Sequence, residues 1–317
     1  MTRSIALDSN VWRYLVDADR VEDLYRASKK AGARVVVLPA VLYEAIRMEA
    51  SPTRDAIVKV LCRRAWHRSM PEAYLEAEEV RRAIADHHPE WLVRNPDLRA
   101  WHELRADWLE GTWRRARSDP SAFAEILAPT DSVRLAKARI EATRIKEHVR
   151  ENGITLERFQ PEQLRSTPEK PEPGADGSPF DAWRGDALNV WSDALLGRVS
   201  SSYGDWLRPW VRPDIPIRSR QGWINFWLSE ITASEVPRQW MRTMAFWAAA
   251  TRKQSSGTPV DWQISTYMFD FDDFVTADRV FVDVLKKLAP HAPLSYATPR
   301  LLSGGDSAID DLIAVVG

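Results

Sequence analysis

Short apolar runs near the start of the 317-residue chain predict two buried β-strands. The first run is Ser4–Leu7, and the second, Arg34–Leu38, contains three consecutive valines. Between them, a helical pattern begins at Val21 and stops at Gly32, a residue type that commonly ends helices. A strand, a helix and a second strand in this order predict a parallel pair, as in α/β proteins.

Strand patterns return only near the other end of the chain. Phe274–Thr276 predicts a third strand and Pro293–Ala297 a fourth, with a helix at Arg279–Leu288 between them. A short helix that begins at Thr258-Pro259 precedes the third strand. Both ends of the chain are therefore predicted to be α/β.

The middle of the chain has helical patterns and no internal repeat. Residues 52 to about 118 are predicted to be helical, with breaks at three proline-containing dipeptides. Further helices are expected at Pro39–Met48, Asp131–Asn152, from Phe180, at Gly222–Ile231 and at Val236–Lys253. The stretch Ser166–Pro179 is rich in proline and glycine, so it is predicted to be an exposed linker.

The amino-acid composition is typical of a globular protein. Hydrophobic residues make up 44% and charged residues 28% of the chain, as in globular proteins. The 44 basic and 45 acidic side chains nearly balance, so any basic surface must be local. The single cysteine, Cys62, excludes an intrachain disulfide and agrees with a reducing compartment. Because no stretch approaches 18 apolar residues, we expect a cytoplasmic protein without a membrane partner.

Four carboxylates lie near the predicted strands, and open parallel sheets bind ligands beyond the carboxyl ends of their strands. Asp8 follows the first strand and Asp278 the third. Glu44 lies in an otherwise apolar helical stripe, where a carboxylate is costly unless it is paired or binds a cation. Asp261 shares a helical face with apolar residues. Helix capping is an alternative role for three of these acids, but it accounts neither for Glu44 nor for their joint order.

Taken in order, these segments resemble the PIN domain, a family of metal-dependent ribonucleases. The resemblance rests on Asp8-Ser9-Asn10 after a strand, Glu44 on the helix after the second strand, Asp261 opening a helix, and the strand and Thr-x-Asp pattern of residues 275–281. It implies that Asp8, Glu44, Asp261 and Asp278 form one catalytic pocket that binds Mg²⁺ or Mn²⁺, and that Ser9, Asn10 and Thr276 hold or orient these acids.

The implied activity is endonucleolytic hydrolysis of phosphodiester bonds in an RNA substrate. Four converging carboxylates would repel one another unless divalent cations neutralised them, which agrees with a metal site. Many bacterial members of the family are toxins or defence effectors. The resemblance therefore also implies that the partner could be an antitoxin or another protein of a defence system. The alternatives are a catalytically inactive scaffold that binds nucleic acid or a protein, and a DNA nuclease, for which no further acidic motif is present. The oligomeric state stays open.

One spacing departs from a compact family member. Asp8 and Glu44 are 36 residues apart and Asp261 and Asp278 are 17 apart, but 217 residues separate Glu44 from Asp261. Since the entropy of loop closure grows only logarithmically with length, a folded insertion is tolerable there. The resemblance thus implies a PIN-like parallel sheet flanked by helices, formed by residues 1–68 and 238–317, with an all-α, Trp-rich insertion at 69–237.

Basic and aromatic residues interleave at residues 63–68 and 112–117, and basic residues line one face of the helix after Asp131. Arginine with indole is a combination that single-stranded RNA recognition uses. The candidate nucleic-acid-binding residues are Arg63, Arg64, Arg114, Arg115, Arg117, Arg134, Lys137 and Arg144. The alternative is a solvated helix face with tryptophan turned to the core. For the 15 Trp residues, pairs at helical spacing favour packing over base stacking.

Other polar groups are assigned structural roles. Asp270, Asp272 and Asp273 are predicted to form a solvated loop, with a supplementary metal ligand among them as the alternative. A phosphatase-type Asp-x-Asp site at Asp270 is excluded because only 45 residues follow Asp272. His87 and His88 are predicted to form a polar helix end rather than a metal site.

Overall fold

The computed structural model describes residues 2–166, 177–198, 202–251, 258–302 and 307–317, without the side chains of residues 128–139, 141, 142 and 258–261. Its centre is a five-stranded sheet in the order β3-β2-β1-β6-β7, and all four strand pairs are parallel. The strands are β1 (Ser4–Leu7), β2 (Arg34–Val37), β3 (His67–Arg68), β6 (Asp273–Thr276) and β7 (Thr298–Leu301). The predicted α/β class is confirmed.

The first three predicted strands are confirmed, whereas the fourth is wrong in position. The fourth strand of the sequence prediction, Pro293–Ala297, is not a strand, and β7 follows directly after it. Because β7 is a largely exposed edge strand with the sequence Thr-Pro-Arg-Leu, it carries no apolar run. The two-residue β3 at the opposite edge is too short to give a periodic signal.

Sixteen α-helices lie within the described ranges. They are α1 (Ser9–Asp17), α2 (Val21–Ala31), α3 (Pro39–Arg47), α4 (Pro52–Leu61), α5 (Glu72–His87), α6 (Arg99–Ala106), α7 (Trp113–Ser118), α8 (Pro120–Glu151), α9 (Ala182–Leu196), α10 (Ser202–Leu207), α11 (Ile215–Arg218), α12 (Arg220–Asn225), α13 (Pro237–Ala250), α14 (Thr258–Thr266), α15 (Arg279–Leu288) and α16 (Ala308–Val316). The π-helical segments Asp107–Thr112 and Phe226–Glu230 interrupt this series, and β4 (Arg165–Ser166) pairs antiparallel with β5 (Phe180–Asp181).

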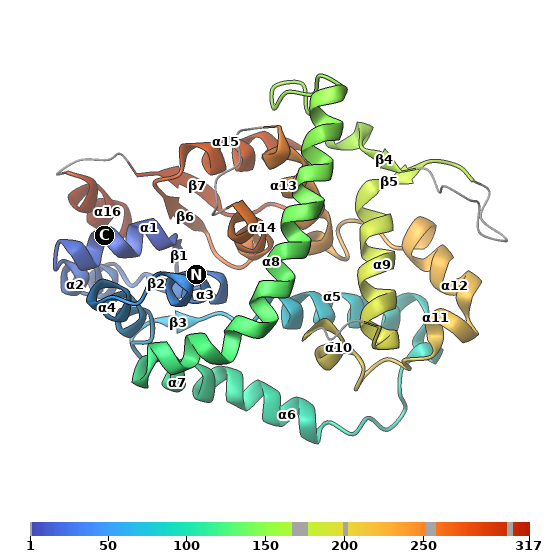
Figure 1. Cartoon of the computed structure of the whole chain (residues 1–317), viewed down its shortest axis with the longest axis horizontal. Coiled ribbons are helices and arrows are strands. Elements are labelled where there is room, and N and C mark those ends of the chain that lie inside the picture. The colour runs from blue at the N-terminus through green and yellow to red at the C-terminus, as the bar shows by residue number, and fades with distance from the viewer. Residues whose placement is uncertain (1, 167–176, 199–201, 252–257, 303–306) are drawn as a thin grey trace.

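The helix predicted at residues 131–152 begins eleven residues earlier, as α8 at Pro120. Asp119 caps it by accepting a hydrogen bond of 2.9 Å from the backbone N–H of Ala122, and Pro120 suits the first turn. In Figure 1, α8 runs across the molecule between the sheet and helices α9 to α12. The predicted linker, Ser166–Pro179, lies mostly outside the described residues.

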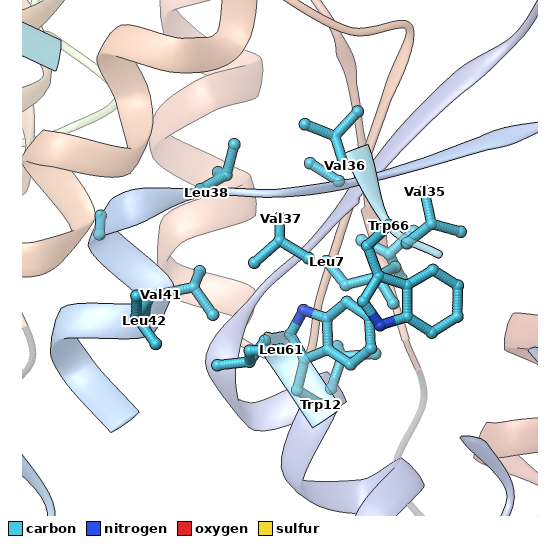
Figure 2. Close-up of a cluster of buried hydrophobic side chains, with 14 of the residues drawn as sticks. Leu7, Trp12, Val35, Val36, Val37, Leu38, Val41, Leu42, Leu61 and Trp66 are labelled. Atoms are coloured by element: carbon cyan, nitrogen blue, oxygen red, sulfur yellow. The ribbon is translucent and has the colours of Figure 1, made fainter. Parts of the chain in front are cut away.

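Two large hydrophobic cores hold these elements, and a small third cluster joins α8 to α13. The sheet core contains Leu7 and Leu61 around Trp12 and Trp66, whose ring centroids are 5.5 Å apart (Figure 2). The helical core contains seven buried tryptophans, Trp91, Trp183, Trp191, Trp206, Trp223, Trp227 and Trp240. None of the 15 Trp residues is exposed, so the prediction that they serve packing is confirmed.

The division into residues 1–68, 69–237 and 238–317 stays a prediction. Each core contains residues from both sides of the predicted boundaries. Trp108, Trp113 and Phe123 come from the predicted insertion but belong to the sheet core, whereas Trp240 and Met244 of α13 belong to the helical core. The helical middle therefore packs against the sheet and is not a separate domain connected to it only by a linker.

A buried ionic network joins α5 to α13. Glu79 binds Arg238, which also binds Asp270, and Glu76 binds Arg242. Burial raises the pKa of Glu76 to about 8 and that of Glu79 to about 7, although the arginine charges oppose the shift. With Glu72 3.8 Å from Arg242, four carboxylates share two guanidinium groups, so proton uptake by a carboxylate is favoured.

We predict that this network makes the protein less stable as the pH rises through neutrality. The pKa of Glu79 lies above its value of 4.5 in the unfolded chain, so its contribution is fully present below pH 4.5 and is lost as the pH passes about 7. From pH 6 to pH 8, the free energy of unfolding should fall by about 1 kcal/mol through Glu79 alone.

Glu79→Gln, which keeps the shape and removes the charge, should flatten this dependence in urea unfolding followed by tryptophan fluorescence. Glu78→Gln, on the half-buried neighbour that pairs with Arg81, serves as the control and should keep the wild-type slope. An equal pH slope in wild type and Glu79→Gln would contradict the assignment.

Candidate functional site

The pairing of β1 with β6 brings Asp8 and Asp278 to one edge of the sheet. Leu7 is opposite Val275 in the register, and the Asp8 N–H donates a 3.0 Å hydrogen bond to the carbonyl of Val275. Asp278 follows two residues after the end of β6. The strand order reverses direction on either side of β1, and such a switch point is where parallel sheets bind ligands.

Thr276 links the two acids. Its Oγ1 donates a 2.6 Å hydrogen bond to Asp8 Oδ2 and accepts a 3.0 Å hydrogen bond from the backbone N–H of Asp278. The Ser9 N–H donates to Asp8 Oδ1 at 2.7 Å, and Asn10 Oδ1 accepts from the N–H of Ala277 at 3.3 Å. All three residues expected to support the acids, Ser9, Asn10 and Thr276, thus lie at this edge.

Glu44 on α3 lies close enough to Asp8 for the two charges to interact. Burial raises its pKa and the charge of Asp8 raises it further, whereas a hydrogen bond with Ser9 and the charge of Arg47 oppose the shift. Burial also raises the pKa of Asp8, where the hydrogen bonds from Thr276 and Ser9 oppose the shift and the charge of Asp278 adds to it. Asp8 therefore lies close enough to both Glu44 and Asp278 for its charge to interact with theirs.

The capping roles considered for two of these acids are present as well. Asp8 is the N-cap of α1, and Asp278 caps α15 through a 3.0 Å hydrogen bond from the Phe281 N–H to its Oδ1. Capping does not account for Glu44, which lies inside α3. Each carboxylate oxygen has two lone pairs, so a capping acid retains acceptor capacity for a ligand.

The fourth predicted acid, Asp261, lies on α14, which packs against α3. Its side chain is outside the described residues, so its convergence with the other acids stays a prediction. Among the side chains that are described, no group of three or more His, Cys, Asp or Glu has a metal-binding arrangement. The donor chemistry nevertheless fits Mg²⁺ or Mn²⁺, because Asp8, Glu44 and Asp278 offer only oxygen ligands and a cation would offset their mutual repulsion.

The acids before β6 are not part of this site. Asp273 is 4% exposed and binds both Arg3 and Arg300, so the prediction that it belongs to a solvated loop is wrong. Asp272 accepts hydrogen bonds from Ser4 at the amino end of the sheet. These residues lie at the opposite end of β6 from Asp278, which rules them out as supplementary ligands.

His87 and His88 form a polar helix end, as predicted. His87 Nε2 lies 2.6 Å from Glu235, His88 Nε2 lies 2.7 Å from Glu230, and the His88 ring stacks on Trp91.

The predicted nucleic-acid-binding residues have different environments. Arg63 pairs with Glu22 and Arg115 with Asp107, so their charges are compensated. Arg64, Arg114 and Arg117 line one cavity together with Arg68, the last residue of the basic and aromatic segment 63–68. Arg144 is exposed on α8, and the side chains of Arg134 and Lys137 lie outside the described residues.

A second cavity, of about 390 Å³, lies against α3. Its lining includes Tyr43 and Arg47 from α3, Trp108 and Arg115 from the segment around α7, and Tyr267. Neither Tyr43 nor Arg47 was predicted as a site residue, because the packing of helices that are distant in sequence creates the space beside them.

Comparison of the chain with protein-family models, with curated proteins and with solved structures gives no match. Within the described ranges, no helix is long and apolar enough to cross a membrane. The interpretation of the acidic site therefore depends on its own residues and on their contacts.

We predict that Thr276→Val lowers the free energy of unfolding by about 1–3 kcal/mol. The substitution keeps the shape of a fully buried side chain but leaves Asp8 Oδ2 and the Asp278 N–H without their common partner. Thr276→Ser keeps the hydroxyl and should cost only about 1 kcal/mol for the lost methyl group. Urea unfolding of both variants tests this, and equal losses would show that packing, not the hydrogen bonds, matters at this position.

Proposed function

We propose that the protein is a PIN-like, Mg²⁺- or Mn²⁺-dependent endoribonuclease. The observation that supports the proposal is the juxtaposition of Asp8, Glu44 and Asp278, from three distant segments, at the carboxyl edge of a parallel sheet. Burying like charges together is costly. Folded proteins keep such a costly arrangement mainly at functional sites. Carboxylates with perturbed pKa values in a crevice at a sheet edge are typical of such sites.

The residues of the chain have distinct roles in this proposal. Asp8, Glu44 and Asp278, with Asp261 as the fourth, would hold the cation, and Thr276 and Ser9 fix the orientation of Asp8 through hydrogen bonds of 2.6 and 2.7 Å. Asn10 ties the start of α1 to the turn after β6. When bound, a divalent cation supplies positive charge that stabilises the developing phosphorane and lowers the pKa of an attacking water.

RNA is the proposed substrate because of the family resemblance and because uncompensated arginines lie on the same protein. Toxins and defence effectors are frequent in the family, so a role of this kind, with an antitoxin or another defence protein as partner, is part of the proposal by analogy.

The second candidate is a catalytically inactive scaffold that binds nucleic acid or a protein. Asp8 and Asp278 both act as helix caps, a role that needs no metal, and this observation favours the scaffold. Metal binding separates the two candidates.

For the nuclease, Mn²⁺ should stabilise the wild-type fold. At a free concentration of 100 times the dissociation constant, the increase in unfolding free energy is about 2.7 kcal/mol, provided that the unfolded chain does not bind the ion. Glu44→Gln, which removes one charge from the site and keeps its shape, should reduce this increase by at least half. Calorimetry that detects no Mn²⁺ binding to the wild-type protein would favour the scaffold.

Purified protein should cleave single-stranded or structured RNA when Mn²⁺ is present, and Asp8→Asn should lower the rate at least 100-fold. A carboxylate that holds a catalytic cation stabilises charge in the transition state, and loss of one such group costs about 2.7 kcal/mol or more. Asp86→Asn, on the exposed surface of α5, serves as the control and should keep the wild-type rate.

Cleavage is measured on a labelled RNA by gel electrophoresis, with near-ultraviolet circular dichroism as the check on folding. If Asp8→Asn is folded and still cleaves RNA at the wild-type rate, the assignment of the acidic site is wrong.

A further inference from the structure

The two basic segments of the sequence meet at one cavity beside β3. Residues 63–68 lie between α4 and β3, and residues 113–118 form α7, which packs against α4. The cavity between them has a volume of about 650 Å³. The lining residues that define its chemistry are Arg64, Arg68, Glu110, Trp113, Arg114 and Arg117. We call this cavity the arginine pocket.

Positive charge in the arginine pocket is not compensated. Four guanidinium groups face one carboxylate, that of Glu110. Throughout the part of the chain that the structure describes, Arg64, Arg114 and Arg117 have exposed side chains and no ion-pair partner. Their sequence neighbours differ, because Arg63 binds Glu22 and Arg115 binds Asp107. Within these two described segments, the exposed arginines that line the cavity remain available to an anion.

Arg68 is held rigidly in the wall of the pocket. Its Nη atoms donate to the carbonyls of Cys62 at 2.9 Å and Leu109 at 3.3 Å, and its guanidinium lies 5.0 Å from the centre of the Trp113 ring. Its Nε is buried without a hydrogen-bond partner. Burial lowers the pKa of Arg68, and the charges of Arg64 and Arg117 lower it further. A bound anion would relieve this repulsion and give the buried wall a counter-charge.

The pocket also has a defined position relative to the acidic site. Arg68 ends β3, and Val37 of β2 is its partner in the register, so Arg68 lies at the same carboxyl edge of the sheet as Asp8. Two strand spacings separate β3 from β1, which is about 10 Å between strand axes. A strand of a few nucleotides covers that distance.

We infer that the arginine pocket binds backbone phosphate groups of the RNA strand, on one side of the bond that the acidic site cleaves. Planar guanidinium groups bind phosphate oxygens through paired hydrogen bonds, and four of them can hold more than one phosphate. This inference rests on the proposed function for the identity of the anion. The phosphate groups of a free nucleotide have the same chemistry, so the experiment distinguishes the two sources.

The test measures the affinity of the full chain for a labelled single-stranded RNA by fluorescence anisotropy, in EDTA and at several KCl concentrations. The variant is Arg64→Ala/Arg114→Ala, whose positions are exposed and unpaired, so the fold should be kept. The control is Arg94→Ala/Arg158→Ala, which removes two exposed arginines outside the pocket.

The loss of two phosphate contacts should make the slope of log affinity against log salt concentration shallower by about 1.4, since each contact with a single strand contributes about 0.7. At about 0.1 M salt the affinity should fall about tenfold or more. The control should stay within about twofold of wild type. Inorganic pyrophosphate should compete with RNA for the wild-type pocket.

An unchanged slope in the pocket variant, or an equal loss in the control, would overturn the inference. Loss of pyrophosphate binding without loss of RNA affinity would also overturn it, because the pocket would then take a free nucleotide. RNA cleavage with Mn²⁺ is scored separately. Cleavage with an unchanged slope refutes only the pocket, whereas a shallower slope without any cleavage supports the pocket and refutes the nuclease.

Discussion

The parallel pairing of β1 with β6 is the contact on which the acidic site depends. It joins residues about 268 positions apart, Ile5 with Asp273 and Leu7 with Val275. Closing so long a loop costs only a little more entropy than closing a short one, because the cost grows logarithmically. The pairing is stabilised from both faces by a core in which Leu7, Trp12 and Phe274 are fully buried. Without this pairing, Asp8 would lose Thr276, and Asp278 would lie on an unrelated part of the surface.

Buried charges are compensated in different ways in different parts of the molecule. At the amino edge of the sheet, Asp273 is compensated by Arg3 and Arg300. Between α5 and α13, carboxylates outnumber guanidinium groups, and proton uptake supplies the balance. At the carboxyl edge, Asp8 and Glu44 receive hydrogen bonds, and the charge of Arg47 offsets that of Glu44 only in part, since the pKa of Glu44 stays raised. In the arginine pocket the excess charge is positive, because four arginines and one glutamate line it. The excess charges of the acidic site and of the arginine pocket thus lie at the same edge of the sheet, negative near β1 and positive near β3.

The helical middle of the chain contributes to this arrangement through packing. Trp108 and Trp113 enter the sheet core, and that contact sets α7 against α4. Because α7 carries Arg114 and Arg117, the indole side chains position the basic groups without being exposed themselves. These two tryptophans therefore serve the pocket indirectly, and Trp113 also lies beneath the guanidinium group of Arg68.

Local patterns were sufficient for elements whose side chains are buried on a regular period. The apolar run of Ser4–Leu7, the valines of β2 and the cap and stripe of α15 predicted their own structure and, through strand direction, the edge where Asp8 and Asp278 meet. β3 and β7 lacked such a pattern, because one has two residues and the other is exposed. The start of α8 had a local signal, Asp119-Pro120, that the amphipathic pattern alone does not contain.

Sequence by itself determined the α/β class and the positions of Asp8 and Asp278 after strands, whereas the supporting role of Thr276 was implied by the family resemblance. Only the tertiary structure decided which arginines are free. Arg63 and Arg64 are adjacent in sequence and chemically identical, yet one meets Glu22 and the other faces a cavity. Whether a charge is compensated depends on what lies across space from it, and Glu22, which pairs with Arg63, is 41 residues away in the sequence. Short-range periodicity contains no information about such contacts.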